Sequence, residues 1–124
     1  MNPRARVYGF EPRRTLFERY QRNCRLNGFH VHAFRTALSN GAGMGVMPGW
    51  VLEKGTEARA LDDEVIPTTR LDALIESCSI GRVDGAKIDV EGHEPEILER
   101  MGRFLAEFKP TLLIEVLSDG AGEK

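Results

Sequence analysis

Cysteine and aromatic residues are scarce in this sequence, and their scarcity excludes several classes of protein. The 124 residues include two cysteines, and aromatic side chains make up 7% of the chain. Cys24 and Cys78 form no C-x-x-C pair, so neither a disulfide framework nor a cysteine zinc site is expected. Both are predicted to be reduced thiols that pack as small apolar side chains.

An excess of charge of one sign and long apolar runs are also missing. The chain has 17 Lys+Arg and 19 Asp+Glu, a formal net charge of −2. A protein dedicated to nucleic acid or to a membrane surface normally has a basic excess, so neither partner is expected. No apolar run approaches the roughly 18 residues of a membrane span, and the apolar stretch 7–10 is shorter than a signal-peptide core of about 7–15 residues. These features predict a cytoplasmic globular protein.

One local charge bias opposes this interpretation. The first 25 residues have a net charge of +5, with arginine at positions 4, 6, 13, 14, 19, 22 and 25. A basic helix is able to bind phosphate backbones. No base-reading module accompanies these arginines, so a solvated helix face is the favoured interpretation and a nucleic-acid-binding helix is the alternative.

Hydrophobic periodicity alternates between strand and helix along the chain. Strands are predicted at residues 7–10, 29–34, 83–90 and 111–117, with an irregular or hairpin strand at 46–52. Helical faces recur over residues 16–27, 71–78 and 94–108, and Gly28 is placed as a helix C-terminal glycine. This alternation predicts a single α/β domain over residues 1–117 with a mostly parallel sheet, followed by a polar tail at 118–124.

The segment Lys87-Ile88-Asp89-Val90-Glu91-Gly92-His93-Glu94 contains the most informative pattern. In a strand, Lys87, Asp89 and Glu91 lie on one face and the two apolar residues on the other. A Lys87–Asp89 ion pair near a sheet edge is one explanation of this charged face. The other is a functional site, because ligands of open α/β sheets bind beyond the carboxyl ends of the strands. Two acids on one face are also expected to raise each other's pKa, partly offset by the lysine.

Lys87 to Leu98 resembles the signature of the FkbM-type methyltransferases, S-adenosylmethionine-dependent enzymes that methylate hydroxyls of sugars, polyketides and similar metabolites. Four weaker matches occur in the same order as in that family, at residues 8–12, at 27–28 with 37–39, at 67–72 and at 109–116. The resemblance covers residues 7–117 and implies a Rossmann-like class I methyltransferase sheet.

The resemblance also implies roles for particular residues. Glu11 would bind the ribose hydroxyls of the cofactor, and Ala37 and Leu38 would lie against its adenine. Asp89 and Glu91 would face the sulfonium and the acceptor hydroxyl. His93 is the first candidate for the base, because histidine changes charge near neutral pH, and Asp89 is the second. A carboxylate–histidine metal site is the alternative, although no metal is predicted.

In such a fold the glycine loop that cradles the cofactor ends the first strand, about 20 residues before the ribose-binding acid. Only ten residues precede Glu11, so the first strand and its loop are expected to be missing, along with later strands of the family. The glycine-rich stretch 41–45 does not replace that loop, because Pro48 and Gly49 interrupt any helix after it. S-adenosylmethionine is therefore expected to bind weakly. The alternative function is a non-catalytic α/β interaction module, with self-association through exposed sheet edges.

Overall fold

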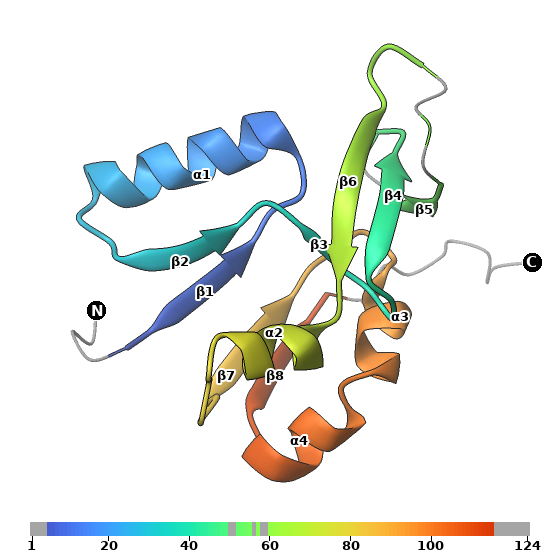
Figure 1. Ribbon diagram of the computed structural model, residues 1–124. Helices are drawn as coiled ribbons and strands as arrows, with labels where there is room; N and C mark the ends of the chain where they lie inside the picture. The colour runs from blue at the N-terminus through green and yellow to red at the C-terminus, as the bar shows by residue number, and fades with distance from the viewer. Residues whose placement is uncertain (1–4, 50–51, 56, 58–59, 116–124) are drawn as a thin grey trace, which may run out of the picture.

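The computed structural model describes residues 5–49, 52–55, 57 and 60–115. Figure 1 shows its elements in chain order: β1 (Val7–Phe10), α1 (Arg14–Leu26), β2 (Val31–Phe34), β3 (Ala37–Leu38), β4 (Gly43–Met47), β5 (Glu53–Lys54), β6 (Glu64–Thr69), α2 (Leu71–Ser77), β7 (Gly85–Ile88), α3 (Glu94–Glu99), α4 (Gly102–Phe108) and β8 (Thr111–Ile114). The predicted tail at 118–124 and parts of two predicted strands, at 50–51 and 116–117, lie outside the described residues.

The helices form largely where the apolar period predicts them, with one correction. Gly28 follows α1 with a φ of 65°, which is the left-handed conformation expected after a helix. The single helix predicted over 94–108 is wrong, because it is divided into α3 and α4. At the division, Arg100 N–H and Met101 N–H donate to carbonyls three residues back, Ile97 and Leu98, which tightens and ends α3. Met101 and Phe104 still face the core, so the apolar period continues across the break.

The strands form three separate sheets rather than the one sheet expected. β1 pairs in parallel with β2, and β7 pairs in parallel with β8. The remaining four strands form a mixed sheet in the order β3-β6-β4-β5, with β4 antiparallel to both of its neighbours. The expectation that β1, β7 and β8 share a sheet is therefore wrong, because a cavity lies between β1 and β7. The fold is α/β, while the mostly parallel Rossmann-like arrangement remains a prediction.

Two apolar clusters form the core. The larger cluster joins β7 to α3 and α4 through Ile88, Ile97, Met101 and Phe104. The smaller cluster lies in the mixed sheet and contains Ala37, Met47 and Ile66. The larger cluster therefore anchors β7, the strand that leads to the charged motif. Cys24 and Cys78 are free thiols, and both are half-buried.

The glycine-rich stretch 41–45 leads into strand β4, and strand β5 rather than a helix is the next element among the described residues. Residues 43–47 form β4, and a Cβ on Gly45 would lie 2.7 Å from Leu52 Cδ1 and 3.1 Å from the Glu53 carbonyl oxygen. Glycine is thus needed there for close approach of β5.

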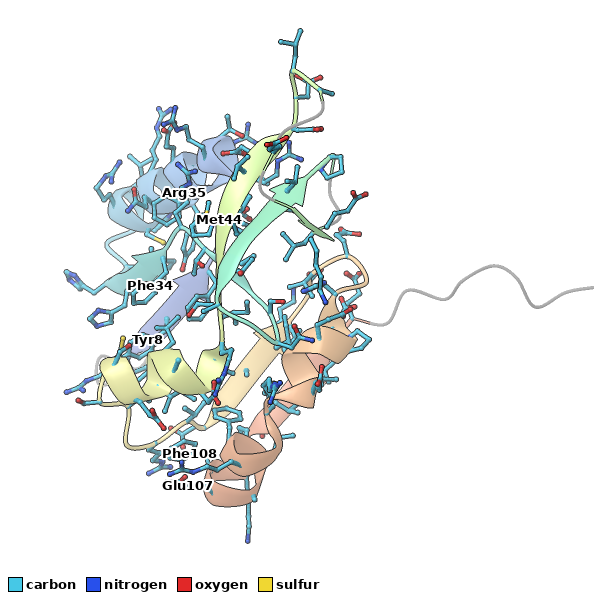
Figure 2. The ribbon with its side chains drawn as sticks, turned by 45° about the vertical axis from the view of Figure 1, so that its right-hand side comes forward. Tyr8, Phe34, Arg35, Met44, Glu107 and Phe108 are labelled. Atoms are coloured by element: carbon cyan, nitrogen blue, oxygen red, sulfur yellow. The ribbon has the colours of Figure 1, made fainter. Side chains whose placement is uncertain are left out.

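The arginines of α1 lie at the surface of the molecule (Figure 2). At the start of that helix, the Glu64 carboxylate accepts hydrogen bonds from Arg14 N–H. No helix in the described part of the chain is long and apolar enough to span a membrane.

Candidate functional site

The charged motif follows β7 with the alternation that its sequence predicts. Ile88 is buried at 6% exposure, and Val90 packs against the same core cluster. Lys87, Asp89 and Glu91 are exposed. Lys87 and Asp89 form the ion pair that was one explanation of the charged face, but that pair does not account for the acids and the histidine that follow.

A tight turn over residues 90–93 positions the acids and the histidine. Glu91 and Gly92 both have positive φ, 53° and 93°, and His93 N–H donates to the Val90 carbonyl at 3.3 Å. Positive φ is unfavourable for glutamate, and strain of this kind concentrates at functional sites. The turn is therefore held in its conformation by contacts around it.

Glu94 supplies those contacts. Its side chain is buried, with 8% of the residue exposed, and its Oε1 accepts hydrogen bonds from Val90 N–H at 3.1 Å and Gly92 N–H at 3.3 Å. Burial alone would raise the pKa of this carboxyl, but donation from the backbone N–H groups of Glu94, Val90 and Gly92 outweighs it and lowers the pKa below 4.5. Glu94 is thus the acceptor around which the turn closes.

Replacing Glu94 by alanine is expected to destabilise the fold by about 1.5–3 kcal/mol at neutral pH, because two backbone donors lose a charged acceptor. Since the pKa of Glu94 is lowered in the folded state, its contribution is complete above the ordinary carboxyl pKa of 4.5 and is lost as the pH falls through the lowered value. Urea unfolding of both proteins between pH 7 and pH 3 measures this difference. Glu107→Ala removes an exposed acid and serves as control; an equal effect of both changes would contradict the role of Glu94.

Three acids lie together beyond the ends of β7 and β8. Asp89, Glu91 and Glu115 each place a carboxylate oxygen within 4.8 Å of the others, and all three are exposed. A hydrogen bond with Asp89 raises the pKa of Glu115, whereas hydrogen bonds from Lys87 and then Glu115 lower the pKa of Asp89. The expectation that Asp89 has a raised pKa is therefore wrong, because hydrogen bonds with Lys87 and with Glu115 both lower it.

His93 lies between a hydroxyl and a carboxylate. Its Nε2 is 3.0 Å from Ser39 Oγ, and its Nδ1 is 3.7 Å from Glu96 Oε2 one turn later. The imidazole side chain is 14% exposed. Contacts at both ring nitrogens fix the orientation of the imidazole. Within the described residues, His93 is not a member of the acidic cluster, so the structure gives no support to the carboxylate–histidine metal site.

The residues predicted to bind the cofactor differ in burial: Glu11 is half-buried, whereas Ala37 is buried in the core. Glu11 directly follows β1, is half-buried, and accepts a hydrogen bond from Arg13 N–H at 2.9 Å through Oε1. Ala37 is buried in the core cluster of the mixed sheet, and Leu38 packs against the other cluster. Thr36, beside them, donates its hydroxyl to the Pro67 carbonyl at 2.8 Å. The segment 36–38 is therefore held firmly between the two clusters.

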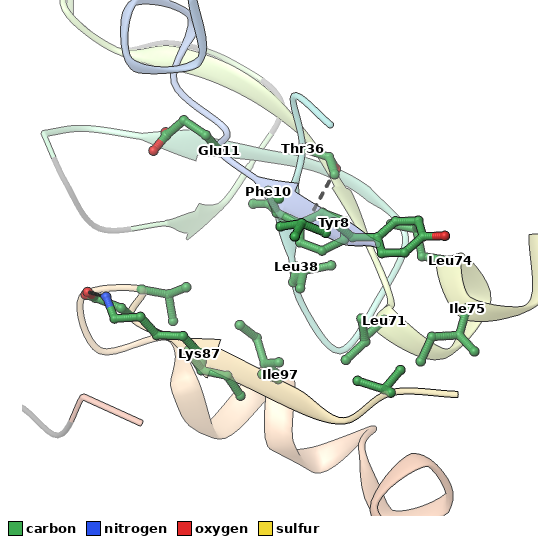
Figure 3. A pocket seen from close by; sticks show the side chains of 18 of the residues that line it. Tyr8, Phe10, Glu11, Thr36, Leu38, Leu71, Leu74, Ile75, Lys87 and Ile97 are labelled. Atoms are coloured by element: carbon green, nitrogen blue, oxygen red, sulfur yellow. Dashed lines mark hydrogen bonds and ion pairs between the residues drawn. The ribbon is translucent and has the colours of Figure 1, made fainter. Parts of the chain in front are cut away.

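One cavity of about 1210 Å³ brings the predicted residues together (Figure 3). Its lining includes every residue predicted for the site: Glu11, Ala37, Leu38, Asp89, Glu91 and His93. In Figure 3, Glu11 and Lys87 lie at the same end of this cavity, and apolar side chains such as Leu71 and Ile75 line the other end. His93 also lines a second, smaller cavity of about 160 Å³ together with Ser39 and the glycine-rich stretch.

Sequence reasoning assigned no site role to four residues that the structure brings into the site: Ser39, Glu94, Glu96 and Glu115. Glu94 and Glu96 stand in the motif itself, and a carboxylate after a glycine turn that opens a helix is a recognisable signal of an acceptor for backbone N–H groups. Glu115 was visible as the single acid in the predicted apolar run 111–117. Ser39 had no signal, since it is 54 residues from the histidine that it contacts.

Comparison with known proteins agrees with the sequence motif. Residues 1–123 match the family described as the methyltransferase FkbM domain. The hexuronic acid methyltransferase AglP of Haloferax volcanii is 32% identical over 100 residues, which cover 79% of this chain and 42% of that relative. No solved structure matches the chain. Because the family match extends over nearly all of its length, the chain belongs to the FkbM methyltransferase family.

Proposed function

We propose that this chain contributes to S-adenosylmethionine-dependent methylation of a sugar hydroxyl. The observation that supports this function best is the fixed histidine at the cavity, whose lining also includes Glu11, Asp89 and Glu91. The acceptor is proposed to be a hydroxyl-bearing metabolite of the sugar class, with a hexuronic acid as the first candidate because the curated relative is named for that substrate.

The cavity and its residues fit S-adenosylmethionine. Its volume of about 1210 Å³ exceeds the usual 300–1,000 Å³ of small-molecule sites, so space does not limit binding. The Glu11 carboxylate would accept the ribose hydroxyls, and the 36–38 segment would lie along the adenine. Carboxylates of Asp89 and Glu91 would favour the cationic sulfonium through charge attraction. When bound, the cofactor supplies an electrophilic methyl group.

His93 would then accept the proton of the acceptor hydroxyl. His93 would hold that proton at Nε2, while S-adenosylmethionine held by Glu11 and residues 36–38 would supply the methyl group. Glu96, 3.7 Å from Nδ1, would stabilise the imidazolium that forms. Ser39 Oγ lies 3.0 Å from Nε2. The acceptor hydroxyl would replace Ser39 as the hydrogen-bond partner of that nitrogen. A positioned base of this kind typically contributes about 10²–10⁴-fold to the rate.

Replacing Glu11 by glutamine is expected to weaken S-adenosylmethionine binding by about tenfold, because the ribose hydroxyls would lose hydrogen bonds to a charged acceptor. The comparison is isothermal titration calorimetry of both proteins with S-adenosylmethionine. Glu18→Gln, an exposed acid of α1, is the matched control. Melting temperatures are measured in parallel, because Glu11 also accepts from Arg13 N–H. Equal affinities of Glu11→Gln and the unchanged protein would contradict the assignment.

A further inference from the structure

His93 borders both cavities of the site. It lines the cavity of about 1210 Å³ and also the cavity of about 160 Å³. Its Nε2 is 3.0 Å from Ser39 Oγ, and Ser39 lines the smaller cavity but not the larger one. The ring nitrogen that is proposed to take the proton therefore has its hydrogen-bond partner in the smaller cavity. A hydroxyl that replaces Ser39 at this nitrogen would reach it from the smaller cavity.

The smaller cavity has a polar wall that is held in place on two sides. Ser39 N–H donates to the Thr69 carbonyl at 2.9 Å, and Asn40 Nδ2 donates to Glu99 Oε2 at the end of α3 at 2.8 Å. The glycine-rich stretch 41–45 forms another part of the wall, where short side chains leave the backbone accessible. Polar groups that are fixed before a ligand binds set its orientation. The cavity thus suits a small ligand rich in hydroxyls.

The size of the smaller cavity limits what it holds. Its volume of about 160 Å³ is below the usual 300–1,000 Å³ of small-molecule sites, so it admits one sugar unit and not S-adenosylmethionine. The larger cavity has room for the cofactor. Two ligands would then meet at His93, each from its own cavity.

The two cavities also differ in charge near the histidine. Asp89 and Glu91, which precede His93 in the motif, line the larger cavity and belong to the acidic cluster, which disfavours an anion there. Lys54 of β5 lines the smaller cavity, is exposed, and has no ion-pair partner among the described residues. Glu53 lines the same cavity but already interacts elsewhere. The smaller cavity therefore offers an available cation to an anionic group.

We infer that the smaller cavity is the acceptor site and that it selects an acidic sugar, whose carboxylate pairs with Lys54 while the hydroxyl to be methylated lies at His93 Nε2. Lysine binds a carboxylate as a point charge with three donors. Lys54 is thus a specificity-determining residue and takes no part in the proton transfer. The assignment rests on the proposed methyl transfer, and it adds where the acceptor binds and which residue selects it.

The first test is a titration of the isotope-labelled chain with D-glucuronate and with D-galacturonate, followed by amide chemical shifts. We expect shifts at residues 39–45, 53–54 and 68, which line only the smaller cavity. D-glucose, which has no carboxylate, is expected to bind at least ~5-fold more weakly because it lacks the partner of Lys54. Absence of shifts at these residues with both sugar acids, or shifts confined to the larger cavity, would overturn the inference.

Variants of Lys54 test the charge directly. Lys54→Met is expected to weaken D-glucuronate binding at least ~5-fold and to leave D-glucose binding unchanged, whereas Lys54→Arg keeps the charge and the affinity. Lys109→Met is the matched control, because Lys109 is an exposed lysine that lines neither cavity. In the methyl-transfer assay, Lys54→Met is expected to raise KM for the sugar acid by the same factor with kcat unchanged. Equal affinities of Lys54→Met and the unchanged protein for D-glucuronate would overturn the inference.

The inference and the proposed function fail in different ways. Cofactor binding is measured at Glu11 and at residues 36–38, which line only the larger cavity, and sugar binding at residues that line only the smaller one. Loss of the cofactor signal would contradict the proposed function. Cofactor binding and methyl transfer without any dependence on Lys54 would leave that function in place and overturn this inference.

Discussion

His93→Ala is expected to lower the rate of methyl transfer by at least ~10²-fold in the form of the protein that shows the activity. The alanine variant has no group to take the hydroxyl proton at the position now defined by Ser39 and Glu96. The fold is expected to persist, since the imidazole is not part of either apolar cluster. Transfer of labelled methyl from S-adenosylmethionine to a hexuronic acid, measured with substrate saturating, gives the rate.

His30→Ala is the matched control, because His30 is an exposed histidine that lies before β2 and outside the cavity. Its rate is expected to equal that of the unchanged protein. Glu96→Gln is expected to have an intermediate effect, since it removes the charge beside Nδ1 and keeps the histidine. An unchanged rate with His93→Ala, or a large loss of stability with it, would make the histidine structural and contradict its assignment as the base.

Ile97→Ala is expected to lower the free energy of unfolding by about 2–5 kcal/mol, because it opens a cavity in a close-packed cluster. Ile97 is 2% exposed and packs with Ile88, Met101 and Phe104, which join α3 to β7. Urea unfolding followed by circular dichroism measures the difference. Leu61→Ala, at a fully exposed leucine, is expected to change stability by less than about 0.5 kcal/mol. If the two variants lost equal stability, the core assigned to α3 would be wrong.

The sequence predicted those parts of the fold whose pattern is local. The alternation of Ile88 and Val90 with charged neighbours predicted the two faces after β7, and Gly28 marked the end of α1 correctly. The break between α3 and α4 was not predictable from the apolar period, because Met101 and Phe104 preserve that period through the turn. A division into two helices depends on the backbone hydrogen bonds of the turn, which leave no trace in hydrophobicity.

Long-range pairings were predicted less well for a physical reason. The order of strands depends on which edges meet, and no pattern within β1 or β7 shows that a cavity lies between them. In the site, too, the local pattern was predictable and the long-range contacts were not. His93 and the acids were visible in one continuous motif, whereas the contacts of Ser39 with His93 and of Glu115 with Asp89 are made by residues distant in sequence.

The most direct test of the site as a whole is a titration of the isotope-labelled chain with S-adenosylmethionine, followed by amide chemical shifts in two-dimensional NMR spectra. The method detects binding even at millimolar affinity, about −4 kcal/mol. We expect the largest shifts at Glu11, at residues 36–38, at residues 89–91 and at His93, which line one cavity. Shifts confined to the glycine-rich stretch 41–45 and β5, or shifts at none of these residues at millimolar cofactor, would contradict the account of the site.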